Sequence, residues 1–226
     1  MVSIMVILLG EHSPKPGSIL ESYLRLHHWG RMWGRDKVRR LHDGELFGFD
    51  NGAYSAWVNN TSFPKKKFLL RLIDALHQPR HACVLAVAPD IVGGGKDSLW
   101  FSIRWRRCLP NELPWYLAVQ DGMTPRMVRH HMTPFRGVFL GGSDDFKRHA
   151  KEWCDFAHDE GKRFHWGRCR SIRNVEDAWL MDADSIDSTR PVRAITHGEE
   201  ARGREWLNVA RRGPLQKMLF EEDRDE

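Results

Sequence analysis

Cysteine is scarce in this sequence of 226 residues, and no two cysteines form a Cys-x-x-Cys pair. The four cysteines, at positions 83, 108, 154 and 169, give no disulfide framework and argue against a cysteine-rich zinc site. We expect reduced thiols, as in an intracellular protein. Long apolar runs are missing too. The opening run, residues 1–10, is too short to span a bilayer, so we expect a buried strand there and no membrane partner.

The sequence also has no internal repeat, low-complexity stretch or linker. We therefore expect a single domain over residues 1–220, with residues 11–17 as a loop and residues 221–226 as a charged, frayed tail. The length is sufficient for one well-buried α/β domain. Charge of neither sign dominates, because 35 basic and 30 acidic residues give a net charge of +5 at neutral pH. This modest excess favours a polyanionic partner without identifying one.

The clearest pattern in the sequence is a series of strand-like segments that end at polar groups. These ends lie at residues 49–54, 87–90, 119–122, 140–143, 165–168 and 184–191. Helical patterns alternate with them, at 62–77, 97–108, 124–131, 143–161 and 175–181, and we expect Ser143 and Asn174 to cap the last two. Such alternation predicts parallel strands with right-handed crossovers. In an α/β barrel or a doubly wound sheet, the strand ends build one active site.

Five of these strand ends resemble, in order, the motifs of the tRNA-guanine transglycosylase family. Residues 49–54, Phe-Asp-Asn-Gly-Ala-Tyr, resemble its Asp-Ser-Gly-Gly-Tyr/Phe signature, and residues 184–188 resemble its Asp-x-x-Asp-Cys strand. Between them lie Asp90, the Val-Gln-x-Gly sequence of residues 119–122, and Gly141-Gly142. The ordered set is more specific than any single motif. The resemblance implies an α/β fold, a compact (β/α)8 TIM-like barrel in which one element could be irregular or missing.

The resemblance also implies a reaction, in which guanine in a nucleic acid is exchanged for a 7-substituted 7-deazaguanine through a covalent glycosyl-enzyme intermediate. Asp187 would be the nucleophile and Asp50 the general acid/base. These residue types suit the chemistry, because one carboxylate can capture an oxocarbenium-like sugar while a second carboxyl protonates the leaving base. The implied base-binding residues are Asp90, Gln120, Gly141, Gly142, Tyr54 and Trp166.

Two departures from the tRNA enzymes favour DNA as the substrate. No cysteine follows Asp187, so the zinc subdomain of that family is missing, and Asn51 and Ser188 replace its signature serine and cysteine. The sequence is in these respects similar to the compact phage-type DNA-guanine transglycosylases. That similarity implies DNA and a free 7-deazaguanine as partners, no metal and no cofactor. It further implies a phage-encoded enzyme in the host cytoplasm, and it is compatible with a homodimer.

Other interpretations of the same residues stay open. The substrate could be tRNA, or the chain could be an inactive relative that binds nucleic acid without exchange. Strand-end aspartates are commonly turn or cap residues, a salt bridge to Arg190 is the structural alternative for Asp187, and His165 could be a buried histidine rather than a phosphate contact. Tyr54 and Trp166 could be core residues. Five basic residues are candidates for phosphate contacts, or else ordinary surface charges: Lys65, Lys66, Arg168, Arg170 and Arg190.

Overall fold

The computed structural model describes residues 4–10, 17–34, 41 and 44–213. Eight parallel strands in these ranges form a closed barrel in sequence order. The barrel closes between the first and last strands, where Val6 pairs with Ser185 and Leu8 with Asp187. The strands are β1 (Val6–Gly10), β2 (Trp29–Trp33), β3 (Leu46–Phe49), β4 (Cys83–Val87), β5 (Trp115–Val119), β6 (Gly137–Leu140), β7 (Arg163–Trp166) and β8 (Ser185–Ser188).

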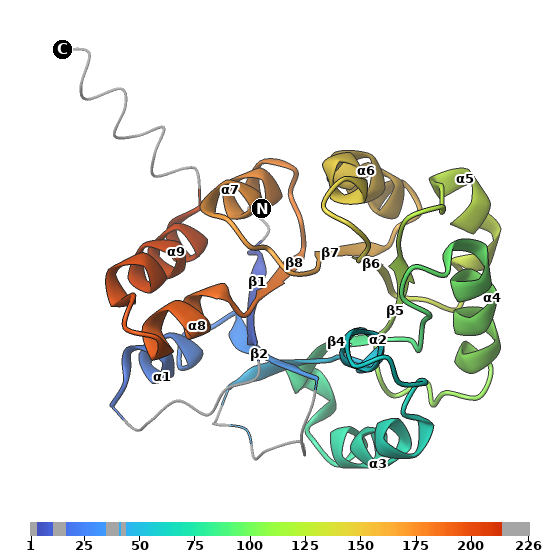
Figure 1. Cartoon of the computed structure of the whole chain (residues 1–226), viewed down its shortest axis with the longest axis horizontal. Coiled ribbons are helices and arrows are strands. Elements are labelled where there is room, and N and C mark those ends of the chain that lie inside the picture. The colour runs from blue at the N-terminus through green and yellow to red at the C-terminus, as the bar shows by residue number, and fades with distance from the viewer. Residues whose placement is uncertain (1–3, 11–16, 35–40, 42–43, 214–226) are drawn as a thin grey trace.

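Helices ring the outside of the barrel, and the short helix α2 lies nearer to the barrel opening than its neighbour α3 (Figure 1). They are α1 (Ile19–Leu24), α2 (Ala53–Val58), α3 (Lys65–Leu76), α4 (Gly95–Arg106), α5 (Pro125–Val128), α6 (Ala150–Asp159), α7 (Ile172–Leu180), α8 (Arg190–Thr196) and α9 (Glu200–Arg212). The 3-10 turns are η1 (Arg80–Ala82), η2 (Arg129–His131) and η3 (Phe146–His149). The architecture is a (β/α)8 barrel, which confirms the predicted fold.

Most strand side chains are buried, on both sides of the sheet, because they alternate between the barrel interior and the helix layer. One apolar cluster, which includes Leu8 and Met32, fills the interior. A larger cluster, which includes Ile7 and Trp115, packs between the sheet and the helices. The interior is tight at Gly48 on β3, where a Cβ atom would lie 2.5 Å from Met32 Sδ and 2.6 Å from Leu8 Cδ1. The same alternation decides which polar residues face the barrel axis.

The structure corrects several sequence predictions of local structure. All eight strands are present, so no strand is missing, and β2 lies at a segment where the sequence predicted none. The helix expected to start at Ser143 begins as η3, and α6 starts at Ala150. Ser143 nevertheless caps this turn, because its Oγ accepts from the N–H of Phe146 at 3.1 Å, while its own N–H and hydroxyl donate to Asp121 in the loop after β5.

The cap of α7, by contrast, was predicted at the wrong residue. Ser171 is the N-cap, and Asn174 completes a capping box from the third helical position. The helix therefore starts three residues earlier than predicted. The predicted loop at 11–17 lies mostly outside the described residues, and the predicted tail at 221–226 lies entirely outside them.

Candidate active site

A cavity of about 790 Å³ lies at the carboxyl ends of the strands. This volume falls within the range of small-molecule sites. Every strand of the barrel or the loop after it contributes to the lining, through Gly10 on β1, Gly34 after β2, Asp50 after β3, Asp90 after β4, Gln120 after β5, Gly141 after β6, Arg168 after β7 and Asp187 on β8. Active sites of (β/α)8 barrels are found at this face. We refer to it as the mouth cavity.

Asp187 is 7% exposed and is held by two donors at one oxygen. His165 Nε2 lies 3.0 Å from Asp187 Oδ1, and the N–H of Arg168 donates to the same oxygen at 3.0 Å. Arg168 makes this contact with φ at +56°, a left-handed conformation that costs a non-glycine residue on the order of 1 kcal/mol. In the described structure the side chain that contacts Asp187 is therefore His165, and not Arg190.

His165 is fully buried and is fixed on three sides. Its Nδ1 lies 2.8 Å from Ser185 Oγ, and its ring stacks on Phe139 with the centroids 4.9 Å apart. If Ser185 donates to Nδ1, then Nε2 carries the proton and donates to Asp187. This arrangement orients the Asp187 carboxylate and leaves Oδ2 for a ligand. His165 is thus the buried histidine that the sequence left as one alternative.

Asp50 lies in the loop from β3 to α2, and its backbone is anchored on both sides. Its N–H donates to the carbonyl of Trp33, while Arg71 on α3 donates to the carbonyls of Trp33 and Asp50 at 2.9 and 2.6 Å. Burial raises the pKa of the Asp50 carboxyl to about 6, and the charge of Asp187 adds to this rise, although Arg71 and the N–H of Gly52 oppose it. A carboxyl with this pKa can exchange a proton near neutral pH.

Asp90 also lines the mouth cavity, and its carboxyl group accepts hydrogen bonds from side-chain amides of its neighbours. Asn51 Nδ2 donates to Asp90 Oδ1 at 2.8 Å and to the carbonyl of Ala88 at 2.8 Å. Burial raises the pKa of Asp90 to about 7; the charge of Asp50 contributes to the rise, and hydrogen bonds from Asn51 and Gln120 oppose it. The two raised pKa values are typical of groups that take part in binding or catalysis.

Gln120 lines the cavity, but both ends of its amide are bound within the protein. Nε2 lies 2.7 Å from Ser98 Oγ, 2.9 Å from the carbonyl of Ile91 and 3.3 Å from Asp90 Oδ2. Its Oε1 accepts from the N–H of Gly93 at 2.5 Å. In this state Gln120 holds the loop after β4 and the Asp90 carboxyl in place, rather than offering a free amide to a ligand.

The glycine turn after β6 also lines the cavity and is fixed by its neighbours. The N–H of Gly141 donates to the carbonyl of Val119 at 2.9 Å, and the carbonyl of Gly142 accepts from Arg168 at 2.8 Å. Gly142 has φ at +75°, and a Cβ there would lie 2.8 Å from Asp121 Oδ2. Asp121 receives both Ser143 donors, and these hydrogen bonds lower its pKa although burial alone would raise it. The turn therefore needs glycine.

Aromatic and basic side chains line the rim of the cavity. Tyr54, at the start of α2, is 40% exposed, and the Arg168 guanidinium lies 4.6 Å from its ring centroid. Trp57, one helical turn later, is 56% exposed, with its ring 5.8 Å from that of Tyr54. Arg170 and Arg193 also line the rim. The rim thus offers both aromatic faces and positive charge to a ligand.

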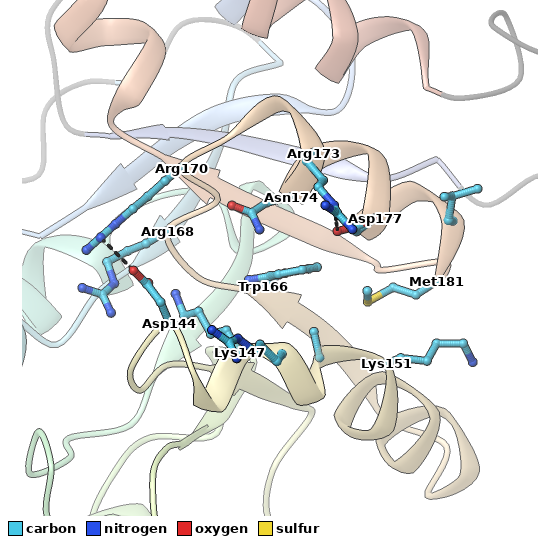
Figure 2. A pocket seen from close by; sticks show the side chains of 13 residues that line it. Asp144, Lys147, Lys151, Trp166, Arg168, Arg170, Arg173, Asn174, Asp177 and Met181 are labelled. Carbon is cyan, nitrogen blue, oxygen red and sulfur yellow. Dashed lines mark hydrogen bonds and ion pairs between the residues drawn. The ribbon is translucent and has the colours of Figure 1, made fainter.

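Trp166 lies on the other side of the sheet from the mouth cavity. His165, the preceding residue on β7, faces the barrel axis, so Trp166 points out into the helix layer, where it is 4% exposed between α6 and α7 (Figure 2). The structure therefore does not bring Trp166 to the mouth cavity with Asp187 and Asp50. The direction of Trp166 follows from the alternation of side chains along each strand. Ser185 lies two residues before Asp187 and faces the same side of the sheet, and His165 on β7 is aligned with Ser185 on β8. His165, and not Trp166, therefore shares the face of Asp187.

The predicted phosphate contacts fall into two groups. Arg168 and Arg170 line the mouth cavity, whereas Lys65, Lys66 and Arg190 are exposed residues that do not. Lys65 starts α3 and lies 5.8 Å from the ring centroid of Trp105. The sequence analysis missed Trp57 at the rim and three basic residues at or beside the site, Arg71, Arg193 and Lys147. Arginines and lysines on helices carry no pattern that separates a site residue from a surface charge.

Among the residues that the structure describes, no group of three or more histidine, cysteine or acidic side chains could hold a metal ion. None of the described helices is long and apolar enough to cross a membrane. All four cysteines are free thiols, and three of them are buried.

Comparisons with known proteins give the chain no family. No family model matches it, and no curated protein matches it in sequence. Among solved structures, it is similar to tryptophan synthase from M. tuberculosis in an aminoacrylate- and BRD0059-bound form, with a TM-score of 0.43 and 16% identity. The match covers 74% of this chain and 62% of that one. The chain thus spans less than two thirds of the solved chain that it matches.

Proposed function

We propose that this barrel exchanges a guanine base in DNA for a 7-substituted 7-deazaguanine, through a covalent intermediate on Asp187. The observation that supports this most is that three of the carboxyl groups lining one cavity lie in different environments. Asp187 accepts two N–H donors at Oδ1, whereas Asp50 and Asp90 have pKa values raised to about 6 and about 7. Carboxyl groups whose environments separate their pKa values suit division into nucleophile and acid.

In the proposed first step, Oδ2 of Asp187 attacks C1′ of the nucleotide. The bond between C1′ and N9 breaks, its electron pair leaves with guanine, and the protonated Asp50 carboxyl supplies the proton. In the second step the ionised Asp50 takes a proton from the incoming base, whose nitrogen displaces Asp187 from C1′. Two displacements at one carbon retain its configuration, as in retaining glycosidases.

Recognition of the base falls to the part of the cavity around Asp90. Guanine presents two neighbouring N–H donors on its Watson–Crick edge, which one carboxylate can accept together. Asp90 accepts from Asn51 at Oδ1 and from Gln120 at Oδ2, which leaves a second lone pair on each oxygen, and it lines the cavity. A bound guanine would favour the ionised form of Asp90, since its donors stabilise the charge. Gln120 would act by positioning Asp90.

The rim of the cavity suits a base that has left its stack. Unstacking costs a few kcal/mol, and aromatic faces can recover part of this. Tyr54 and Trp57 supply such faces, and Arg168, Arg170 and Arg193 supply positive charge for the adjoining phosphates. The preference for DNA over tRNA rests on the sequence resemblance, so the experiment must compare both.

The test is incorporation of radiolabelled guanine into duplex DNA, single-stranded DNA and unmodified tRNA in parallel. We expect incorporation into DNA that is lost in Asp187→Asn and in Asp50→Asn. Asp159→Asn, which changes an exposed carboxylate at the end of α6 that does not line the cavity, is the matched control and should retain activity. Incorporation of guanine into tRNA alone would show that tRNA, and not DNA, is the substrate. Binding without incorporation into any of the three would leave a nucleic-acid-binding protein and refute the exchange.

A further inference from the structure

A second hollow, of about 780 Å³, lies outside the barrel between α6 and α7. Trp166 forms its floor, with Arg168, Arg170 and Asp144 at one end and Lys151 and Met181 at the other (Figure 2). We call it the α6–α7 groove. It is lined by Asp144, Lys147, Arg148, Ala150, Lys151, Trp166, Arg168, Arg170, Arg173, Asn174, Asp177, Leu180 and Met181.

The groove adjoins the mouth cavity. Asp144, Arg168 and Arg170 line both, so the two meet where the loops after β6 and β7 come together. The N–H of Arg168 also contacts the Asp187 carboxylate. The groove therefore begins where the next unit of a chain molecule bound at Asp187 would lie, and at this junction Arg170 pairs with Asp144 at 3.2 Å.

The charge of the groove favours an anion. Six of its lining side chains are lysine or arginine, and two are aspartate. Arg148 pairs with Asp145 at 3.0 Å, and Arg173 lies 3.9 Å from Asp177, with the two arginines 80% and 88% exposed. Exposed pairs of this kind contribute roughly 0–1 kcal/mol each, so a phosphate could replace the carboxylate partners at small cost.

Lys147 gives the groove a fixed, buried cation. The side chain is 7% exposed, and its ammonium donates to the carbonyl of Gly167, in the loop that carries Arg168. Burial lowers the pKa of Lys147 to about 8, with the charge of Arg168 acting in the same direction, so an anion in the groove would favour its charged form. Lys147 thus joins the groove to the loop that orients Asp187.

We propose that the α6–α7 groove binds the phosphodiester backbone next to the nucleotide held in the mouth cavity. The inference rests on the proposed function, since it takes the bound polyanion to be the strand on which Asp187 acts. Backbone contacts of this kind fix the register of a strand without reading its sequence. They also make binding depend on salt concentration, because each phosphate contact releases bound counterions.

The test is the salt dependence of binding to a fluorescent single-stranded DNA that contains one guanine. In Arg148→Gln/Arg173→Gln, we expect the slope of log K against log salt to fall by about 1.4, or about 0.7 for each lost phosphate contact, with affinity about fivefold or more weaker at roughly 0.1 M salt. Arg104→Gln/Arg107→Gln, on α4 and at its C-cap, removes the same charge from exposed positions elsewhere on the ring of helices (Figure 1), and should leave the slope nearly unchanged.

A strand too short to leave the mouth cavity supplies the second comparison. A trinucleotide centred on guanine should bind the wild type and the groove variant equally. Three results would each overturn the proposal. They are an equal loss of affinity in the groove and α4 variants, an unchanged salt slope in the groove variant, and no binding of DNA by the wild type. Because binding is measured without base exchange, a loss of slope confined to the groove variant would support the groove even if no exchange occurs. If base exchange occurs but the salt slope of the groove variant equals that of the wild type, the groove proposal is rejected and the proposed function is not.

Discussion

Asp90→Asn should stabilise the protein at alkaline pH while damaging base binding, because the folded state keeps a carboxyl group where its charged form is unfavourable. The pKa of Asp90 is about 7 in the folded protein, against 3.8 for an unperturbed aspartate. A folded pKa above the unfolded one means that the folded state binds the proton more tightly. The cost of ionising Asp90 is therefore absent below pH 3.8, grows between 3.8 and about 7, and stays constant above.

The magnitude follows from the size of the shift. At 1.36 kcal/mol for each unit, the rise from 3.8 to about 7 corresponds to about 4 kcal/mol at high pH. Solvent screening reduces this value because the carboxyl opens onto the cavity. The asparagine amide would also face the donor of Gln120, which lies 3.3 Å from Asp90 Oδ2. We therefore expect a net gain of about 1–3 kcal/mol at about pH 8 and a much smaller one at about pH 5.

The assay is urea denaturation of the wild type and of Asp90→Asn across this pH range. The difference in free energy of unfolding should grow with pH and level off above about pH 7. Asp159→Asn, an exposed aspartate at the end of α6, is the control and should give a nearly flat difference. A difference that is flat for Asp90→Asn, or that shrinks as pH rises, would refute the reasoning.

Three further predictions concern the parts of the mouth cavity. His165→Phe keeps a ring against Phe139 but loses the donor to Asp187. Because a hydrogen bond to a charged group contributes about 1.5–3 kcal/mol, kcat for exchange should fall about 10- to 150-fold. An unchanged kcat would contradict this role of His165. Gly142→Ala should lower the free energy of unfolding in urea by about 1–3 kcal/mol more than Gly161→Ala, whose Cβ would meet nothing within 4 Å; equal losses would contradict it. Single-turnover release of guanine should slow as pH rises above about 6, because Asp50 must be protonated, and a rate that rises with pH would exclude Asp50 as the acid.

The sequence predicted the strand ends well because each combined a buried run with polar or glycine residues at its end. That pattern located the loops that carry Asp50, Asp90, Gln120 and Asp187, all of which line the mouth cavity. The missed strand, β2, has Arg31 at its centre, and this charge interrupts the apolar pattern. Arg31 is buried because it pairs with Glu45, fourteen residues later. A partner at that distance cannot be identified from strand periodicity alone.

Side-chain direction was harder to predict than position in the chain. Trp166 and His165 are neighbours, and only one of them can face the barrel axis. The outcome depends on the register of β7 against β8, which pairs His165 with Ser185. Lys147 was missed for a similar reason. A lysine within a charged stretch is usually exposed, and its burial becomes evident only when the carbonyl of Gly167 is placed beside it.

The most direct test of the proposed mechanism is detection of the covalent intermediate by intact-protein mass spectrometry under denaturing conditions. The protein is mixed with a DNA oligonucleotide that contains one guanine, and the reaction is quenched with acid. We predict an adduct with the mass of the protein plus the oligonucleotide less guanine, present in the wild type and absent in Asp187→Asn and with an oligonucleotide lacking guanine. Exchange without any adduct, or an adduct that persists in Asp187→Asn, would contradict Asp187 as the nucleophile.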